Sequence, residues 1–260
     1  MRLVSLLSLA LFPLALCAGE SKPLEALLIT GGCCHDYHFQ SAKLTEGTEK
    51  RMPVKWTVDL DPRKGTKGQI KRYEDPQWAA AFDVVVHNEC FAATKDPEYI
   101  RKITEAHKAG TPAVVIHCAM HTYRDAAIDD WRQFLGVTTR HHEHQSHYPV
   151  SVVKADHPIM KGFPAKWTSP KDELYIIKKT EGTTTPLATA KSEKTGESHT
   201  VFWVNQFGNA RVFGTTFGHT NETFSDPVFI DTVSKGMLWV SGKLKDDGTP
   251  AKGYGPPASK

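Results

Sequence analysis

Histidines that follow short apolar runs are the residues of this sequence best suited to chemistry. The 260-residue chain holds 13 histidines, and four apolar runs each lead into at least one of them. The residues that follow these runs are His35 and His38 after residues 24–30, His87 with Glu89 after 83–86, His117 and His121 after 113–116, and His219 after 211–213. Imidazole binds Zn, Cu, Fe or Ni, and it also transfers protons near neutral pH. The pattern predicts one centre for metal binding, acid–base catalysis or both.

The stretch at residues 113–124, AVVIHCAMHTYR, is the most informative. A buried strand is expected to stop at His117, and open parallel sheets hold their ligand sites at this end of the strands. Cys118 occupies the turn where an amidotransferase-like fold would place a thiol nucleophile. Its neighbours are His117 and Ala119 in place of the glycines of a tight turn. We therefore interpret Cys118 as a bystander, and a thiol hydrolase stays a third and weaker hypothesis.

A second cluster of histidines lies in residues 140–148, RHHEHQSHY. Side chains alternate along a strand, so His142 and His144 should share one face. We expect one or two of His142, His144 and His147 to reach the cleft. Metal binding at the surface, without catalysis, is the alternative for this segment.

Short apolar strands that alternate with helical patterns predict an α/β fold, in which helices flank a parallel sheet. The elements expected in the first half are strands 24–30, 54–58, 83–86 and 113–116 and helices 39–50, 96–109 and 125–135. After Gly136 the pattern changes, and successive β-rich segments predict a β-rich insertion in the C-terminal half. Its last two strands, 200–205 and 211–213, should form a hairpin, and residues 228–240 should form the final helix.

The composition is that of a globular protein, with 40% hydrophobic and 23% charged residues. The net charge is only +3, so nucleic acid is not an expected partner. Residues 31–34, GGCC, lack the lysine of a P-loop and the spacing of a dinucleotide fingerprint. Nucleotide binding is therefore not predicted.

The N-terminus, residues 1–19, has the pattern of a secretory signal peptide: Arg2 precedes an apolar segment that ends in small residues. Export to the periplasm or the extracellular space is expected, and a lipoprotein anchored at Cys17 is the alternative. No later apolar stretch is long enough to span a bilayer. Residues 243–260 are rich in Lys, Gly and Pro and are expected to form a flexible tail.

Four cysteines follow the predicted signal peptide, namely Cys33, Cys34, Cys90 and Cys118. An oxidising compartment permits a disulfide between two of them. All four lie near predicted strand ends, so a contact between Cys90 and Cys118 is conceivable, but the pairing stays open.

Four segments in this order resemble the ThuA-like family, named for trehalose utilisation. They are LLITGGCCHDYH, AVVIHCAMHTYR, HPIMKGFPAKWTSPKDELY and RVFGTTFGHTNETFSDPVFIDTVSKGMLWVSG. The resemblance implies a domain over residues 20–242 with the fold of class I glutamine amidotransferases, a flavodoxin-like parallel sheet flanked by helices. It also implies a role in carbohydrate catabolism, on substrates such as 3-keto sugars or glycosides, and divalent metal binding.

The leading hypothesis is an exported, metal-assisted enzyme that moves a proton on a sugar derivative in a histidine-lined cleft. The adjacent carboxylates Asp172 and Glu173 should point to opposite faces of a strand, so that one reaches this cleft. The expected roles are catalysis by His117, His121, Glu89 and Asp172; substrate binding by His38, Tyr123, Arg124 and Glu173; and metal binding by His35, His117, His144 and His219.

The expected cofactor is a divalent metal, with zinc as the first candidate, and the expected partner is a small carbohydrate. A non-catalytic module that binds a carbohydrate or a metal is the alternative, because six tryptophans are available for sugar contacts. The oligomeric state stays open.

Overall fold

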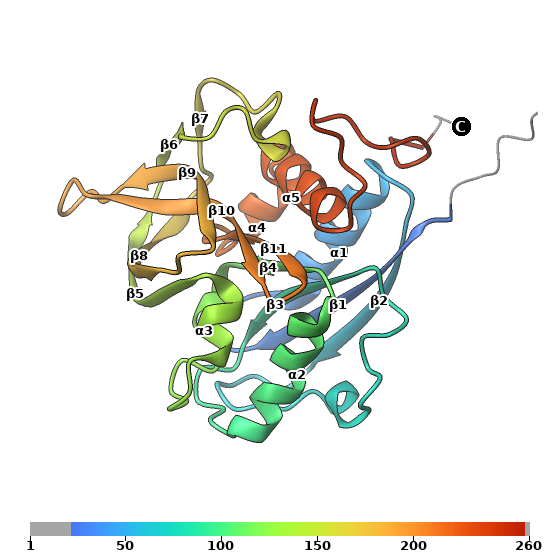
Figure 1. The fold of residues 1–260 in the computed structure, drawn as a ribbon. Helices are drawn as coiled ribbons and strands as arrows, with labels where there is room; N and C mark the ends of the chain where they lie inside the picture. The colour runs from blue at the N-terminus through green and yellow to red at the C-terminus, as the bar shows by residue number, and fades with distance from the viewer. Residues whose placement is uncertain (1–21, 258–260) are drawn as a thin grey trace, which may run out of the picture.

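A nine-stranded sheet forms the centre of the computed structural model, which describes residues 22–257 (Figure 1). The strand order is β2-β1-β3-β4-β11-β10-β9-β6-β7. The bounds of these strands are β1 Leu24–Gly32, β2 Val54–Asp61, β3 Val84–Cys90, β4 Ala113–Ile116, β6 Pro149–Val152, β7 Trp167–Thr168, β9 Thr184–Lys191, β10 Ser198–Phe207 and β11 Ala210–Thr215. The five strands from β2 to β11 run parallel, and the remaining strands pair antiparallel. The predicted α/β class is confirmed, with a β-rich part in the C-terminal half.

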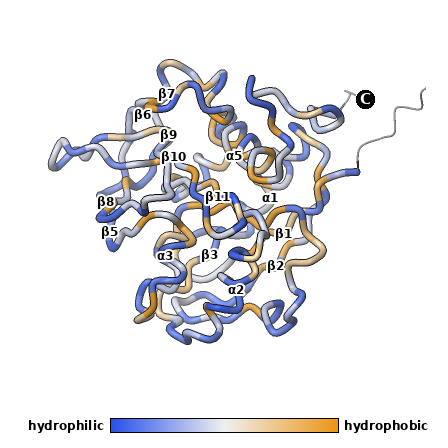
Figure 2. Tube along the Cα trace, viewed as in Figure 1, coloured by the Kyte–Doolittle hydropathy of each residue, from blue (hydrophilic) through white to orange (hydrophobic). Residues whose placement is uncertain are grey.

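Helices cover both faces of the sheet, because successive side chains of the buried strands point in opposite directions. Leu28 and Val114 pack with one apolar cluster, which includes side chains of α1 (Tyr37–Glu49) and α5 (Pro227–Val240). Their neighbours Ile29 and Val115 pack with a second cluster, which includes α2 (Pro97–Ala109) and α3 (Asp130–Leu135). Figure 2 shows these apolar stretches running through the interior strands.

Aspartates cap the N-termini of the three longest helices, a position at which Asp is among the preferred residues. The side chains of Asp36, Asp96 and Asp226 accept hydrogen bonds from backbone N–H groups in the first turns of α1, α2 and α5. Pro97 and Pro227 begin α2 and α5, where the missing N–H costs nothing. Residues 125–135 form less helix than expected, because α3 begins only at Asp130. The chain before it forms a 3₁₀ turn, His117–Met120, followed by further turns.

A second, two-stranded sheet carries the histidine-rich segment. It pairs β5 (Val137–Ser146) antiparallel with β8 (Asp172–Thr180). His142 lies opposite Tyr175 and Gln145 lies opposite Glu173, so three residues of β5 span two of β8. This irregularity breaks the alternation assumed for His142 and His144, which have different surroundings in the structure.

The hairpin expected near the end of the chain is confirmed, since β10 and β11 pair antiparallel through Phe207 and Ala210. A short helix, α4 (Asn221–Ser225), precedes α5. Beyond α5, Leu244 bridges to Pro250, and both Leu244 and Tyr254 pack against the first apolar cluster. The flexibility expected for residues 243–260 stays a prediction.

The predicted signal peptide lies outside the described residues. Within residues 22–257, none of the helices combines the length and the apolar character that a membrane crossing requires.

Candidate functional site

Side chains from several elements line a pocket of about 230 Å³ at the ends of the central strands. It collects His35 after β1, Cys118 and His121 after β4, and His219 after β11, as the edge of a parallel sheet should. The small sheet closes it from the side with His142 of β5 and with Glu173 and Tyr175 of β8. Three of the four histidine-bearing segments expected to meet therefore converge here, and the fourth, which carries His87 and Glu89, does not bring these two side chains to the pocket.

A larger hollow, of about 790 Å³, lies along β2 and the 3₁₀ turn Lys71–Glu74. Its arginines are already paired, Arg63 with Asp61 and Arg72 with Asp59. It contains neither histidine nor cysteine. We place the functional site in the smaller pocket, because chemistry-bearing groups converge there and not in the larger hollow.

His117 follows the end of β4 and is fully buried behind the pocket, in contact with the lining residue Tyr175. Its backbone φ is 46°, a left-handed conformation that non-glycine residues seldom adopt and that often marks functional sites. Its Nδ1 lies 2.6 Å from the Thr216 carbonyl oxygen and so must donate the hydrogen bond. The neutral ring then has its lone pair on Nε2, which is 3.3 Å from the Tyr175 hydroxyl and 3.7 Å from Glu173 Oε2.

His35 is held in the same tautomer. Its Nδ1 lies 3.1 Å from the His219 carbonyl oxygen, which can only accept, and its Nε2 faces Cys118 Sγ at 3.0 Å. The ring centroids of His35 are 4.9 Å from His117 and 4.8 Å from His219. Burial lowers the pKa of His35 to about 4, and it lowers the pKa of His117 well below the usual value. Both imidazoles are therefore neutral at pH 7 and offer lone pairs.

Glu173 is the carboxylate at the centre of the pocket. Its Oε2 lies 3.2 Å from His219 Nδ1 and 3.3 Å from His142 Nδ1. Burial alone would lower the pKa of His219, but attraction to the Glu173 carboxylate beside it outweighs burial and raises the pKa. Ligand atoms of His117, Glu173 and His219 all lie within 4.8 Å of one another, as donors around one ion would.

Asp172 lies beneath the pocket and holds the loop that carries His219. Its carboxylate accepts hydrogen bonds from the backbone N–H of Gly218 at 2.9 Å, from that of His219 at 3.2 Å, and from the Thr223 hydroxyl at 2.6 Å. Burial raises the pKa of Asp172 to about 6, although these hydrogen bonds act to lower it. Asp172 therefore positions the loop that carries His219. It does not line the pocket, so the structure does not support the catalytic role predicted for it.

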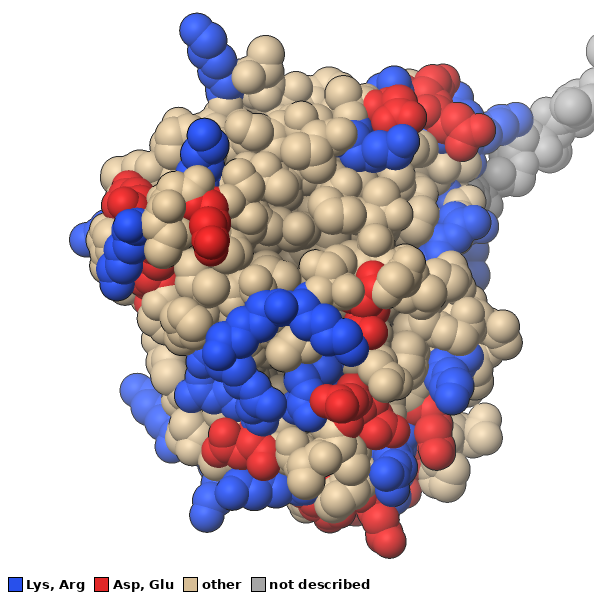
Figure 3. All heavy atoms as spheres, turned by 60° about the vertical axis from the view of Figure 1, so that its left-hand side comes forward, with Lys and Arg blue, Asp and Glu red and all other residues tan. Residues whose placement is uncertain are grey.

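His121 and Arg124, both predicted site residues, do line the pocket. The His121 ring stacks on Tyr175 at a centroid distance of 4.3 Å, and its Nε2 has no hydrogen-bond partner. Burial lowers the pKa of His121 to about 3. Arg124 reaches from the rim to the Arg140 carbonyl oxygen and forms no ion pair within residues 22–257. Figure 3 shows Lys and Arg side chains clustered on the face that comes forward when the left-hand side of Figure 1 is turned toward the viewer.

Four other predicted residues are not brought to the pocket. His38 is exposed on α1. His144 is paired with Glu193 at 2.8 Å. Tyr123 is buried between the rings of Tyr99 and Trp131.

Glu89, the fourth, faces the opposite side of the sheet. The ladder of β3 continues to Cys90, so Glu89 is still inside the sheet and not in a loop beyond it. It contacts His87 Nδ1 at 2.9 Å, His87 Nε2 contacts His107 Nε2 at 3.0 Å, and His107 Nδ1 donates to the Thr111 carbonyl oxygen. Burial raises the pKa of Glu89 well above its usual value, so a neutral carboxyl donates into this chain. The arrangement is an internal hydrogen-bond network away from the pocket, in which only Oε2 of Glu89 has no partner among the described residues.

Sequence reasoning missed Tyr175 and Gln145. Tyr175 stacks on His121 and contacts His117, and Gln145 touches His219 Nε2 at 2.7 Å. The position of Tyr175 could have been predicted, because side chains alternate along a strand and Tyr175 lies two residues after Glu173 on the same face of β8. The position of Gln145 could not have been predicted, because its orientation follows from the irregular pairing of β5 with β8.

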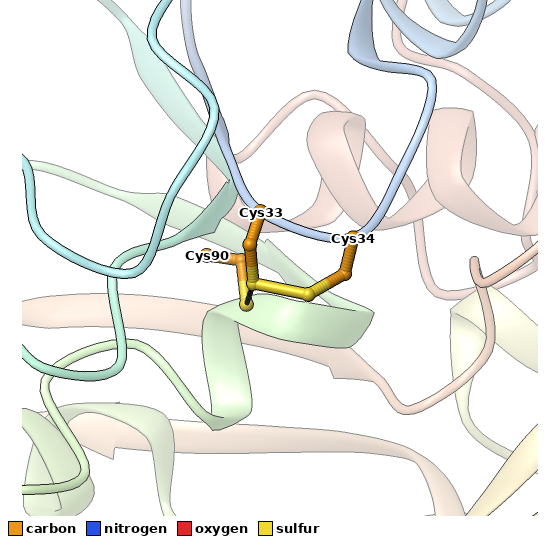
Figure 4. A group of neighbouring side chains, drawn as sticks. All are labelled: Cys33, Cys34 and Cys90. Atoms are coloured by element: carbon orange, nitrogen blue, oxygen red, sulfur yellow. Dashed lines mark hydrogen bonds between the residues drawn. A yellow bond between two sulfur atoms is a disulfide. The ribbon is translucent and has the colours of Figure 1, made fainter.

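The cysteines pair as neighbours: Cys33 and Cys34 form a disulfide, while Cys90 and Cys118 are free thiols (Figure 4). A hydrogen bond with Cys90 and burial together raise the pKa of Cys118 well above its usual value. A thiolate is therefore disfavoured at Cys118, which supports its interpretation as a bystander.

A family model described as ThuA, trehalose utilisation, matches residues 26–240. A solved structure described as a thua-like protein, from Parabacteroides merdae, is 21% identical with a TM-score of 0.68 and covers 90% of this chain and 97% of its own. Another, from Bacteroides uniformis, is 15% identical with a TM-score of 0.67 and covers 86% and 94%. A β-galactosidase from Bacillus circulans sp. alkalophilus is 12% identical with a TM-score of 0.56 over 86% of this chain and 32% of its own. These likenesses show the fold, and no curated protein matches the chain significantly.

Proposed function

Because the chain belongs to the ThuA family, we propose that it acts on a carbohydrate derivative, such as a 3-keto glycoside, as a metal-assisted acid–base enzyme. The family's description, trehalose utilisation, supports the substrate class. The observation that supports the chemistry most directly is the pair of fixed tautomers. His35 and His117 each donate Nδ1–H to a backbone carbonyl, which leaves the Nε2 lone pair of His35 facing Cys118 Sγ and that of His117 facing Tyr175 and Glu173. Protein metal ligands are commonly oriented in this way.

The donor set fits a divalent cation of the zinc type. His117 Nε2, Glu173 Oε2 and His219 Nδ1 would hold the ion, since two imidazoles and a carboxylate are a common zinc set with a position left for substrate. His219 Nδ1 lacks a hydrogen bond of good geometry although Glu173 lies 3.2 Å away. In the structure the Gln145 amide nitrogen lies against His219 Nε2, so a metal at Nδ1 would require the proton to move to Nε2 and the Gln145 amide to turn its oxygen toward it.

A bound divalent ion supplies Lewis acidity, which polarises a sugar carbonyl or hydroxyl and acidifies the adjacent C–H or O–H group. The chain's own residues supply the rest. His121 is neutral and has an unpartnered Nε2, so it is placed to accept a proton or a hydroxyl hydrogen bond. Arg124, which has no carboxylate partner in the described part of the chain, is placed to donate to sugar oxygens that gain charge.

Export stays part of the proposal and is supported by the N-terminal sequence pattern, together with a disulfide of the kind that an oxidising compartment permits. The alternative binding module gains less support. The tryptophans Trp78, Trp131, Trp167 and Trp203 are buried, and no tryptophan of residues 22–257 is exposed as a platform for a sugar ring.

Metal analysis with turnover tests the proposal. Purified wild type should contain about one divalent ion per chain, and His117→Ala should lose it, because Nε2 of His117 is one of three donors. A chelator should abolish turnover of an oxidised disaccharide, and re-addition of the ion should restore it. His144→Ala is the matched control: this histidine pairs with Glu193 outside the pocket, so metal content should not change.

Two results would count against the enzyme. Wild type that holds no metal and is unaffected by chelator would contradict the metal-assisted mechanism. Metal and sugar binding without any turnover would favour the module.

A further inference from the structure

Three sulfur atoms gather on one wall of the pocket and have no part in the proposed function. Cys33 and Cys34 form a disulfide, and Cys90 Sγ lies 3.4 Å from Cys33 Sγ. The three Sγ atoms lie within 4.8 Å of one another, and Figure 4 shows the Cys90 side chain pointing at the disulfide. Three cysteines can form only one disulfide among themselves, so one thiol is always left beside it.

The backbone fixes this cluster. Gly32 of β1 lies opposite Cys90 of β3 in the parallel ladder, and the Cys33 N–H donates to the Cys90 carbonyl oxygen at 3.3 Å. Gly32 has a φ of 100°, and a Cβ there would collide with the same carbonyl oxygen. Only glycine allows β1 to approach so closely, and this approach places the two cysteines that follow it over Cys90. Two core strands therefore set the position of the sulfurs.

The backbone of Cys34 is also unusual, with a φ of 86°. Such a conformation costs free energy in a non-glycine residue and persists where the surrounding structure imposes it, often at functional sites. Cys34 is exposed, Cys33 is half-buried and Cys90 is buried. A reductant can therefore reach the disulfide from solvent, whereas the sulfur of Cys90 is buried beneath it.

The spacing suits a thiolate metal site once the disulfide is open. Zinc binds cysteine sulfur at about 2.3 Å, so tetrahedral thiolates around one ion lie about 3.8 Å apart. The separation of Cys33 Sγ from Cys90 Sγ, 3.4 Å, is close to this, and opening the disulfide frees Cys34 Sγ to move to a similar distance. Soft thiolate ligands select Zn²⁺, Cd²⁺ and Cu⁺ over hard cations.

We propose that Cys33, Cys34 and Cys90 form a redox-gated site for a thiophilic d¹⁰ cation, separate from the histidine centre. In the structure the disulfide closes this site. A dithiol reductant opens it: the S–S bond accepts two electrons and two protons to give two thiols, and the reductant becomes a disulfide. Metal binding then displaces the protons of the three thiols. Exchange with a small-molecule disulfide, which takes up the two electrons and becomes two thiols, re-forms the Cys33–Cys34 bond and expels the ion.

Cd²⁺ titration of the full purified chain tests the proposal, because thiolate ligands give Cd²⁺ an ultraviolet charge-transfer band that imidazole and carboxylate do not. The protein is reduced with a phosphine, which is then removed under anaerobic conditions. Reduced wild type should develop the band at one equivalent, and oxidised wild type should not. Cys34→Ser, a change at an exposed position, should weaken Cd²⁺ binding by about tenfold or more, since even loss of a hydrogen-bond partner of a metal ligand costs about that much.

Two control variants make the assignment specific. Cys118→Ser removes a buried thiol outside the trio and should keep the band. His219→Ala disables the histidine centre and should also keep the band, so failure of this proposal is distinguishable from failure of the proposed function.

The proposal is overturned by no band in reduced wild type, by an equal band in the oxidised protein, or by full affinity in reduced Cys34→Ser. Loss of the band in Cys118→Ser would assign the ion to another set of sulfurs and contradict it too. Cys90→Ser serves as the second variant, with a circular dichroism melt to establish that it folds, and it should bind as weakly as Cys34→Ser.

Discussion

At the scale of single residues, burial decides what each histidine does. His35, His117 and His121 are held neutral by burial, whereas the carboxylate of Glu173 raises the pKa of His219. Two other histidines, His87 and His107, are fully buried on the opposite side of the sheet, where they bond to each other and His87 bonds to Glu89. Residue type alone does not separate these two groups, since both follow or flank apolar strands.

The buried histidine pair should make stability depend on pH. Burial lowers the pKa of His107 to about 3 in the folded protein, against about 6.5 in an unfolded chain. Its contribution to stability is complete above pH 6.5 and is lost as pH falls toward 3, because only the unfolded chain binds the proton. His107→Gln can keep hydrogen bonds to His87 and Thr111 without titrating. The dependence of the unfolding free energy on pH should therefore be shallower by about 1.4 kcal/mol per pH unit between pH 6 and about 4.

Urea unfolding across this pH range measures the effect. Phe134→Leu, which alters the ring stacked on His107, is the control. It should lower stability by a similar amount at each pH and keep the wild-type slope. An unchanged slope in His107→Gln would contradict the expected protonation difference.

At the scale of elements, the ends of the strands build the site, and a few backbone positions decide whether they fit. β4 stops at Ile116 and turns sharply at His117, while the loop after β11 approaches it through Gly218. β8 supplies Glu173 and Tyr175 from the side, and Asp172 ties β8 to the loop that carries His219. The site therefore depends on a close fit between two loops and one edge strand.

Gly218→Ala should disrupt this fit. Gly218 has a φ of 132°, and an added Cβ would lie 2.8 Å from Ile116 Cγ2 and 3.0 Å from His117 Cβ. We expect loss of bound metal and a loss of stability that exceeds the control by about 1–3 kcal/mol, the range of overpacking. Metal content and denaturant unfolding measure both effects.

Gly196→Ala is the matched control, since Gly196 has a positive φ of 74° but has no atom within 4 Å of an added Cβ. It should cost only the left-handed backbone penalty of roughly 1–2 kcal/mol and keep its metal. Equal behaviour of the two variants would show that crowding against His117 is unimportant.

At the scale of the whole molecule, the sequence predicts the architecture better than the details of the site. Apolar runs ending in polar residues located the strands, and Asp-Pro pairs located the starts of α2 and α5. The direction of Glu89 could not be predicted, because the point where β3 ends depends on its ladder with β1. The irregular pairing of β5 and the disulfide between Cys33 and Cys34 likewise follow from tertiary contacts that no local pattern encodes.

The central claim is that His117, Glu173 and His219 bind one divalent ion in the pocket. Anomalous diffraction from crystals soaked in zinc tests it most directly, because the signal locates the ion without reference to activity. The account predicts one strong peak in contact with His117 Nε2, Glu173 and His219. A pocket without a peak, with zinc bound only at the exposed histidines of residues 141–147, would contradict it.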